Sequence, residues 1–279
     1  MTEMVAGKLT QLGDGVWRLL APNPGVMTGS GTNSYLFGKT SLTLVDAGPA
    51  IEAHLDALRD AVRDIGLPLT HLVCTHSHKD HSPAAAVLAA EFGLPCWGAG
   101  VVDDPFQDKN WQPARVLSDN ESVMLGGMRL KAIATPGHVS NHLCYLLEDE
   151  GLLFSGDHLI NGSTVVIIPP AGSMSAYMNS LVRLQREGIE MIAPGHGDLI
   201  HDPAVLIETT LQHRKAREDK VMTALASAPG STAQELVPQV YQDVGVHLHV
   251  LAALSLSAHL IKLGEEGRAR QQGDGWWLI

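Results

Sequence analysis

The stretch of this chain with the most chemistry in it is Thr75-His76-Ser77-His78-Lys79-Asp80-His81. Three imidazoles and a carboxylate within six residues are donors that zinc, iron or manganese bind in proteins. His76 and His78 are two residues apart at a strand end, so both side chains leave an extended backbone on one side and can hold one ion. Asp80 and His81 lie past the turn and face a neighbouring position. The spacing therefore predicts a site for two metal ions.

Four donors do not fill two coordination shells, and three later segments offer more. In each of them an apolar, strand-like run ends in a turn of small residues that carries a histidine or an aspartate. These turns are Thr135-Pro136-Gly137-His138, Ser155-Gly156-Asp157 and Pro194-Gly195-His196-Gly197. Turns at strand ends are where α/β proteins place functional residues, and glycine lets the backbone approach closely. His138, Asp157 and His196 are therefore further candidate ligands.

The apolar pattern predicts the elements that must position these residues. Leu69–Thr75 is expected to be a buried strand, and Pro83–Phe92 a helix with Ser82 as its N-cap. The ligand-rich stretch would then be a strand-to-helix loop. Upstream, the pattern predicts three short strands and a helix, over Val16–Ala21, Ser34–Phe37, Leu42–Asp46 and Ile51–Ile65. Strands and helices alternate after this helix, which predicts an α/β fold.

From about Ala204 the pattern changes to helices and a final hairpin. A long helix from about Pro203 is followed by a capping box at Ser231–Gln234, an apolar helix from about Val246 to Glu266, and a hairpin over Arg268–Ile279. Three helices and a wing predict a winged helix. Lys262 is the one basic residue that this interpretation places on the recognition helix, so a structural or interface role is favoured over DNA binding.

The motif order, preceded by Val45-Asp46-Ala47-Gly48, resembles the metallo-β-lactamase superfamily. Together with Gly31–Leu36, Tyr177–Leu181, His213-Arg214 and the terminal winged helix, it is similar to the beta-lactamase-like protein 2 group. The resemblance implies an αββα metallo-β-lactamase sandwich followed by a small winged-helix domain. The expected domains are residues 1–215 and 216–279.

The resemblance also implies roles for individual residues. The first metal would be held by His76, His78 and His138, the second by Asp80, His81 and His196, and both by a bridging Asp157. Asp46 would support the ligand loop instead of binding metal. Two zinc ions are expected, with iron or manganese as alternatives. A hydroxide that bridges the metals and is oriented by Asp80 would be the nucleophile.

Several other residues are candidates for supporting roles. His158 directly follows Asp157 and His201 follows the last ligand turn, so both are assigned to the surroundings of the metal ligands. His142, four residues past His138, is a further candidate for a supporting or substrate role. Lys79, Trp111 and Tyr177 are assigned to a substrate pocket. For the two aromatic residues the alternative is ordinary packing or a dimer contact.

Composition limits the class of partner. The chain has 279 residues, of which 45% are hydrophobic, and a net charge of −11. Such an acidic chain is not expected to be a stable nucleic-acid partner. Three isolated cysteines in apolar runs and no export signal over Met1–Thr10 predict a cytoplasmic protein. Polar residues interrupt Val246–Leu263, which predicts a buried helix and no membrane partner. A homodimer is possible.

The expected activity is metal-dependent hydrolysis of a small-molecule or carrier-bound ester or thioester. The alternative is an endoribonuclease acting on single-stranded RNA, because the resembled group includes an animal enzyme of that kind beside fungal thioesterases that release polyketides. A β-lactam or lactone hydrolase is also less favoured, and the missing export signal counts against the β-lactamase. A mononuclear-iron persulfide dioxygenase and a catalytically silent interaction protein are less favoured, since the two-metal ligand pattern is complete.

Overall fold

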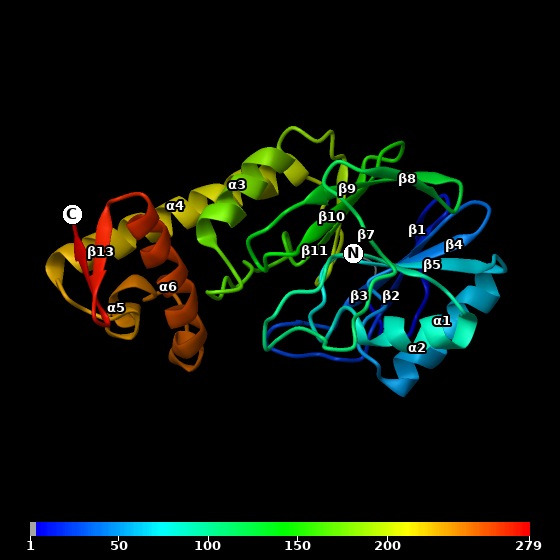
Figure 1. Ribbon diagram of the computed structural model, residues 1–279, viewed down its shortest axis with the longest axis horizontal. Helices are drawn as coiled ribbons and strands as arrows, with labels where there is room; N and C mark the ends of the chain where they lie inside the picture. Colours follow the sequence, from blue (N-terminus) through cyan, green and yellow to red (C-terminus); the bar gives the residue numbers. More distant parts are fainter. Residues whose placement is uncertain (1–3) are drawn as a thin grey trace. The chain divides into compact units, whose positions relative to one another are not determined.

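The computed structural model describes residues 4–279, which divide into two compact units (Figure 1). The first unit is built from the chain up to Thr135 together with Asn141–Thr164 and Glu187–Pro203. The second unit consists of Pro136–Ser140, Val165–Arg186 and Ala204–Ile279. Both units are therefore discontinuous in sequence.

The first unit contains two β-sheets. The larger one has seven strands in the order of the chain, namely β1 (Thr10–Gly13), β2 (Val16–Leu20), β3 (Asn33–Phe37), β4 (Leu42–Val45), β5 (Leu69–Cys74), β6 (Cys96–Gly98) and β7 (Arg115–Val116). The pairs from β1 to β4 are antiparallel, and those from β4 to β7 are parallel. The parallel strands bring their carboxyl ends to one edge of the sheet.

The second sheet has five strands. Their order is β12-β11-β10-β9-β8, with β8 (Ser122–Leu125), β9 (Met128–Ala134), β10 (Leu143–Leu147), β11 (Leu152–Gly156) and β12 (Met191–Pro194). The pairs from β8 to β11 are antiparallel, whereas β11 and β12 are parallel. The carboxyl ends of β11 and β12 carry two of the predicted ligand turns.

Alternating side chains on the strands bury both faces of the first sheet. Leu72 and Cys74 of β5 pack with α1 (Glu52–Ile65) and α2 (Pro83–Phe92), whereas Val73 packs in the cluster that joins the two sheets. This alternation is the two-residue period of a strand. Figure 1 shows α1 and α2 together on one side of the sheet. Both helices and the strands β2 to β5 agree with their predicted bounds to within about one residue, whereas β1 was not predicted.

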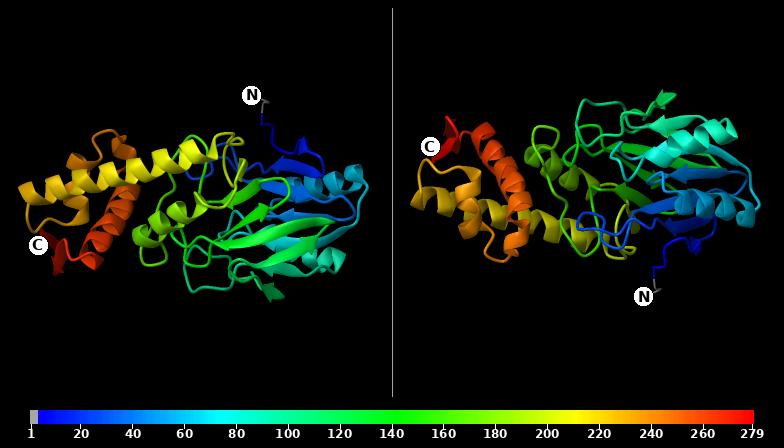
Figure 2. Two further views of the ribbon diagram at one scale, coloured as in Figure 1. Left: turned by 90° about the horizontal axis from the view of Figure 1, so that it is seen from above. Right: turned by 90° about the horizontal axis from the view of Figure 1, so that it is seen from below.

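The second unit contains the remaining helices and the terminal hairpin (Figure 2). These elements are α3 (Met174–Leu184), α4 (Pro203–Ser227), α5 (Ala233–Val240), η1 (Val246–Leu248), α6 (His249–Glu265), β13 (Ala269–Gln272) and β14 (Gly275–Leu278). Leu236, Leu256, Leu260 and Trp276 share one buried cluster that joins α5, α6 and the hairpin. The predicted winged helix is therefore present.

One detail of the predicted helices is corrected. The capping box of α5 uses Thr232 and Glu235, because the hydroxyl of Thr232 accepts the N–H of Glu235 and the Glu235 carboxylate accepts the N–H of Thr232. In the described part of the chain, Val246–Glu265 is long and apolar enough to cross a membrane by composition. That test is weak for this segment, since α6 packs as a core helix against α5 and β13.

Candidate metal centre

The ligand loop begins where β5 ends and is fixed by its neighbour strand. Val45 of β4 is paired with Val73 of β5, so the residues after the two strands lie side by side. One carboxylate oxygen of Asp46 accepts the N–H of Thr75 at 2.7 Å, and the other accepts its hydroxyl at 2.8 Å. The parallel pair therefore sets where the His76–His81 loop starts.

Asp46 also orients two histidines of the loop, His81 directly and His76 through Thr75. Its Oδ2 accepts Nδ1–H of His81 at 2.9 Å. The Thr75 hydroxyl, whose hydrogen is given to Asp46, can accept Nδ1–H of His76 at 3.1 Å. Asp46 is buried and has a φ of 50°, a left-handed conformation that residues with a side chain rarely adopt. Its contacts are those predicted for a residue that supports the ligand loop.

We expect Asp46→Asn to weaken metal binding by roughly 10–100-fold. The amide has the same shape, but its NH2 group would face an N–H or O–H of Thr75 or the Nδ1–H of His81, all of which are donors to Asp46. The start of the ligand loop or the His81 ring must then turn. Zinc affinity measured by competition with a chelator checks this. Asp64→Asn, on the exposed face of α1, is the control. An unchanged affinity in the Asp46 variant would show that the carboxylate does not orient the ligands.

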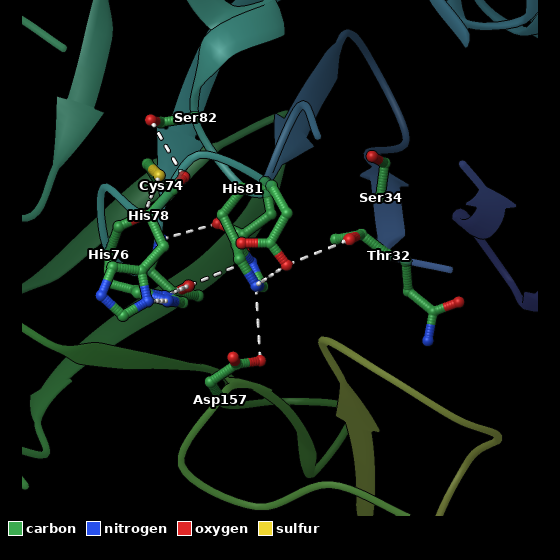
Figure 3. A network of polar contacts seen from close by, with 12 residues as sticks. Thr32, Ser34, Cys74, His76, His78, His81, Ser82 and Asp157 are labelled. Atoms are coloured by element: carbon green, nitrogen blue, oxygen red, sulfur yellow. Dashed lines mark hydrogen bonds and ion pairs between the residues drawn. The ribbon is translucent and has the colours of Figure 1, made fainter. Parts of the chain in front are cut away.

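The second group of candidate ligands, defined as Asp80, His81 and His196, converges with Asp157. Nε2 of His81 lies 3.3 Å from Oδ1 of Asp157 and 3.5 Å from Oδ2 of Asp80. Nε2 of His196 lies 3.3 Å from each of the same two oxygens. A tetrahedral ion with ligands at about 2.1 Å has ligand atoms about 3.4 Å apart, so these spacings fit zinc. Figure 3 shows Asp157 and the ligand loop pointing toward one another.

The hydrogen bonds of the two histidines direct their other ring nitrogens to the centre. Nδ1–H of His81 is donated to Asp46, and Nδ1–H of His196 is donated to the carbonyl oxygen of Gly31 at 3.0 Å. In a neutral ring each Nε2 then carries a lone pair that faces carboxylate oxygens. Nε2 of His81 is also buried without a hydrogen-bond partner among residues 4–279. Two lone pairs facing two carboxylates require a cation between them.

The pKa values of these residues also indicate that a positive charge is needed between the carboxylates. Burial would lower the pKa of His196, but the carboxylates of Asp157 and Asp80 raise it to about 10. Burial likewise opposes the charge on His81, whose pKa is nevertheless raised well above its usual value by Asp80, Asp157 and Asp46. Burial would raise the pKa of Asp80, but His81 and His196 bring it down to about 2. Protons and metal ions therefore compete for one position.

This competition predicts a pH dependence. A histidine with a raised pKa stabilises the fold below its unfolded-state pKa of about 6.5, and this contribution is lost as pH rises through the folded-state value. For His196 that value is about 10. With metal removed by a chelator, the parent protein should be more stable than His196→Gln at about pH 7. We expect this difference in unfolding free energy to become smaller by about pH 10.5. Denaturant unfolding at both pH values measures it. A constant difference would mean that His196 is not held protonated.

The first group of candidate ligands is His76, His78, His138 and Asp157. Nε2 of His76 lies 3.0 Å from Nδ1 of His78, so the two nitrogens can share a proton or bind one cation. Burial, with His81 and His78 nearby, holds the pKa of His76 well below its usual value, so its ring stays neutral and able to bind metal. His138 belongs to the second unit, where it donates Nδ1–H to the carbonyl oxygen of Val166 at 2.9 Å and keeps Nε2 as its ligand atom.

Asp157 is supported by His142, one of the histidines that the sequence made a candidate for such a role. Its backbone N–H is donated to Nε2 of His142 at 3.2 Å, and Nδ1 of His142 lies 2.8 Å from the hydroxyl oxygen of Thr135. His158, the predicted supporting residue, is fully buried with its ring 5.9 Å from that of His142. His142 therefore makes the direct contact, and its place four positions after a predicted ligand was the available signal. His201, the other predicted supporting residue, is exposed beyond β12.

The segment Gly31-Thr32-Asn33 supports the second group, a role that was not predicted from the sequence. The Thr32 hydroxyl donates to Oδ2 of Asp80 at 3.3 Å, and Gly31 supplies the carbonyl oxygen for His196. The Asn33 side chain donates to the carbonyl oxygens of Pro194 and Gly197 at 2.9 and 2.8 Å. The available signal was a run of three polar residues, Thr32-Asn33-Ser34, in front of apolar residues. In the structure all three are buried.

The irregular segment Val101–Pro113 lies against the ligand loop. The N–H of Asp108 is donated to the carbonyl oxygen of Ser77 at 2.6 Å, and its carboxylate accepts the Ser82 hydroxyl at 3.0 Å. This last bond replaces the predicted helix cap, because Ser82 makes no cap with its side chain. Lys79 is exposed and donates to the carbonyl oxygen of Pro105 at 3.3 Å.

The two aromatic residues assigned to the substrate pocket are packed side chains. Trp111 is 2% exposed in the cluster under α1 and α2, and its indole N–H is donated to the carbonyl oxygen of Ala99 at 2.8 Å. Tyr177 of α3 is 1% exposed and lies under the guanidinium of Arg214, 5.2 Å from the ring centre. These contacts match the packing alternative stated for both.

Family models match two parts of the chain. Residues 27–196 match the model described as the metallo-beta-lactamase superfamily, and residues 232–277 match the beta-lactamase associated winged helix domain. The first match contains every residue of the two candidate ligand groups. The second match lies within the predicted C-terminal domain, whose expected boundary after residue 215 lies inside α4 and stays a prediction.

Individual proteins resemble nearly the whole chain. The Beta-lactamase-like protein 2 homolog of Drosophila melanogaster is 30% identical over 94% of this chain and 92% of its own length. The Lactamase-like protein vrtG of Penicillium aethiopicum is 31% identical over 83% of this chain and 74% of its own. A solved metallo-beta-lactamase family protein from Thermus thermophilus has a TM-score of 0.81 at 23% identity, covering 96% of this chain and all of that one. The last likeness concerns the fold alone.

Proposed function

Because this chain belongs to the metallo-β-lactamase superfamily and is a metal-dependent hydrolase of that fold, we propose that it uses two metal ions to hydrolyse an ester or thioester. The observation that carries the proposal is the position of Asp157. Its carboxylate is a member of the first group, and its Oδ1 lies 3.3 Å from a ligand nitrogen of both His81 and His196 in the second group. One carboxylate shared by two ligand groups is the arrangement that holds two ions close together.

Two zinc ions bound here would polarise the substrate and lower the pKa of water enough to supply hydroxide near neutral pH. The residues of the chain contribute position and charge. Asp157 would bridge the groups, with His76, His78 and His138 on one side and Asp80, His81 and His196 on the other. Since the Thr32 hydroxyl and two imidazoles face Oδ2 of Asp80, its Oδ1 is the oxygen left to accept a proton from the nucleophile.

Two cations of the second unit count against RNA as the substrate. Lys262, the basic residue on the candidate recognition helix, is 8% exposed and donates to Glu218 at 2.7 Å and to Glu266 at 2.6 Å. Arg268 of the hairpin donates to the same two carboxylates. Phosphate contacts are made by free cations, and these two are already paired. With a net charge of −11, the chain offers little attraction for a polyanion.

Metal analysis and a substrate panel test the proposal. We expect two zinc ions per chain and turnover of S-acyl thioesters or simple esters, with no cleavage of single-stranded RNA in the same preparation. The panel includes a lactone and a β-lactam, whose preferential hydrolysis would overturn the substrate class. One iron per chain with oxygen uptake on a persulfide would replace the two-metal hydrolase by a dioxygenase. Metal binding with no turnover of any substrate would favour an interaction protein.

A further inference from the structure

Arg214 of α4 is a buried cation with no carboxylate partner. Its side chain is 3% exposed, no ion pair joins it to an acidic residue in the range 4–279, and its Nε is buried without a hydrogen bond. Arg217, one turn later, is 5% exposed but makes two hydrogen bonds to the carboxylate of Asp243 at 2.8 and 2.9 Å. Burying an unpaired charge costs several kcal/mol, so an apolar residue would suit the space of Arg214 better.

Arg214 contacts one backbone carbonyl group and one aromatic ring. Its Nη2 donates to the carbonyl oxygen of Val165 at 2.5 Å, and its guanidinium lies over the Tyr177 ring of α3. Arginine presents its donors in a rigid plane, so this pair of contacts holds the Val165 peptide in one orientation relative to α3 and α4. Val165 lies in an irregular segment, Asn161–Gly172, that has no strand or helix to hold it.

The next carbonyl oxygen along the chain is the one that orients His138. Val166 accepts Nδ1–H of His138 at 2.9 Å. Two consecutive carbonyl oxygens therefore face Arg214 and His138, and moving the first moves the second. All of these residues belong to the second unit.

The loop that carries His138 is fixed by the same elements. The Ser180 hydroxyl of α3 donates to the carbonyl oxygen of Pro136 at 2.8 Å, and the N–H of Ser173 is donated to that of Gly137 at 2.8 Å. A side chain at Gly137, whose φ is +153°, would come within 2.4 Å of Cα of Tyr177. The contacts with α3 and Ser173 thus fix the backbone of the loop. The hydrogen bond to the Val166 carbonyl fixes the orientation of the His138 ring.

We propose that Arg214 is a positioning residue for the metal centre. It fixes the Val165–Val166 backbone so that the Val166 carbonyl keeps the proton of His138 on Nδ1, which makes Nε2 the atom that would bind a metal. This role rests on the proposed function, in which His138 is a ligand of the first ion. It also gives a function to Arg214, Tyr177 and Ser180 in two motifs that the ligand set leaves unexplained.

The test compares Arg214→Met, Arg214→Lys and Arg217→Met in the full chain. Stepwise zinc affinities come from chelator competition, and the absorption of the cobalt-substituted protein reports ligand geometry. We expect Arg214→Met to weaken one binding step by roughly 10–100-fold, to change the cobalt spectrum, and to lower kcat more than it raises KM. Arg214→Lys should recover part of the affinity. Arg217→Met should lower thermal stability and leave both affinities as in the parent.

His138→Ala separates failure of this inference from failure of the proposed function. It should weaken the same binding step as Arg214→Met, and more strongly. If His138→Ala leaves zinc affinity unchanged, His138 is not a ligand and the proposed function loses its first group. If His138→Ala weakens binding while Arg214→Met leaves the affinities and the cobalt spectrum unchanged, the positioning role of Arg214 is wrong and the function stands.

Discussion

Asp157→Ala is expected to remove nearly all hydrolytic activity and the second equivalent of metal. The carboxylate is a member of the first group and faces ligand nitrogens of His81 and His196 in the second, so its loss removes a ligand from the first group and the carboxylate that the two groups share. The decrease in kcat should be at least the roughly 10²–10³-fold that follows removal of a single transition-state donor. Metal content and steady-state kinetics on the best ester or thioester substrate measure it.

Asp149→Ala is the matched control, because Asp149 is an exposed aspartate in the turn that precedes β11. It should keep the activity and the metal content of the parent. His78→Ala tests the other side of the centre and should also lose most activity. Full activity of the Asp157 and His78 variants in a metal-loaded preparation would disprove the two-metal mechanism.

Gly195→Ala is expected to disable the second group without changing any ligand. The added methyl carbon would lie 2.8 Å from Oδ1 of Asp157 and 2.8 Å from Cε1 of His81. A Cβ atom essentially never lies within 3.0 Å of a non-bonded heavy atom in proteins. Both ligands must move, and a displacement of about 1 Å in an active site can cost about 100-fold in rate. We expect a loss of at least that size in kcat/KM and weaker binding of one zinc ion, with an overpacking cost of about 1–3 kcal/mol in stability.

Gly13→Ala is the matched control for this substitution. Gly13 is also a glycine without a left-handed φ, and a methyl group there meets nothing within 4 Å. Its activity, metal content and melting temperature should stay close to those of the parent. If Gly195→Ala folds and keeps both zinc ions bound at parental affinity, the spacing of Asp157 and His81 is not what the centre requires.

The sequence was most informative where geometry is local. His76 and His78 were expected to share one side of the backbone, and their ring nitrogens lie 3.0 Å apart although β5 already ends at Cys74. Helix α2 could be placed after them by Pro83. The contacts of Asp46, expected from the family pattern, follow from two parallel strands that end side by side. Each of these inferences spans a single element or one pair of neighbours.

Contacts between segments far apart in the sequence could not be predicted. Thr32 meets Asp80 across 48 positions and Arg214 meets Val165 across 49, so no local period reports either pair. The roles of Trp111 and Tyr177 could not be assigned for another reason. An aromatic residue in a loop or helix has the same sequence pattern whether it lines a pocket or fills a core.

The division of the chain into two units has a consequence for the time course of folding. Pro136–Ser140 is made between two strands of the first unit, yet it is folded with helices that begin near Ala204. A ribosome that has finished both sheets must still add Ala204–Ile279 before the second unit is complete. Contacts so far apart in sequence form late. We therefore expect zinc to enter the second group of a nascent chain first, and the complete centre to mature only after the winged helix has been synthesised.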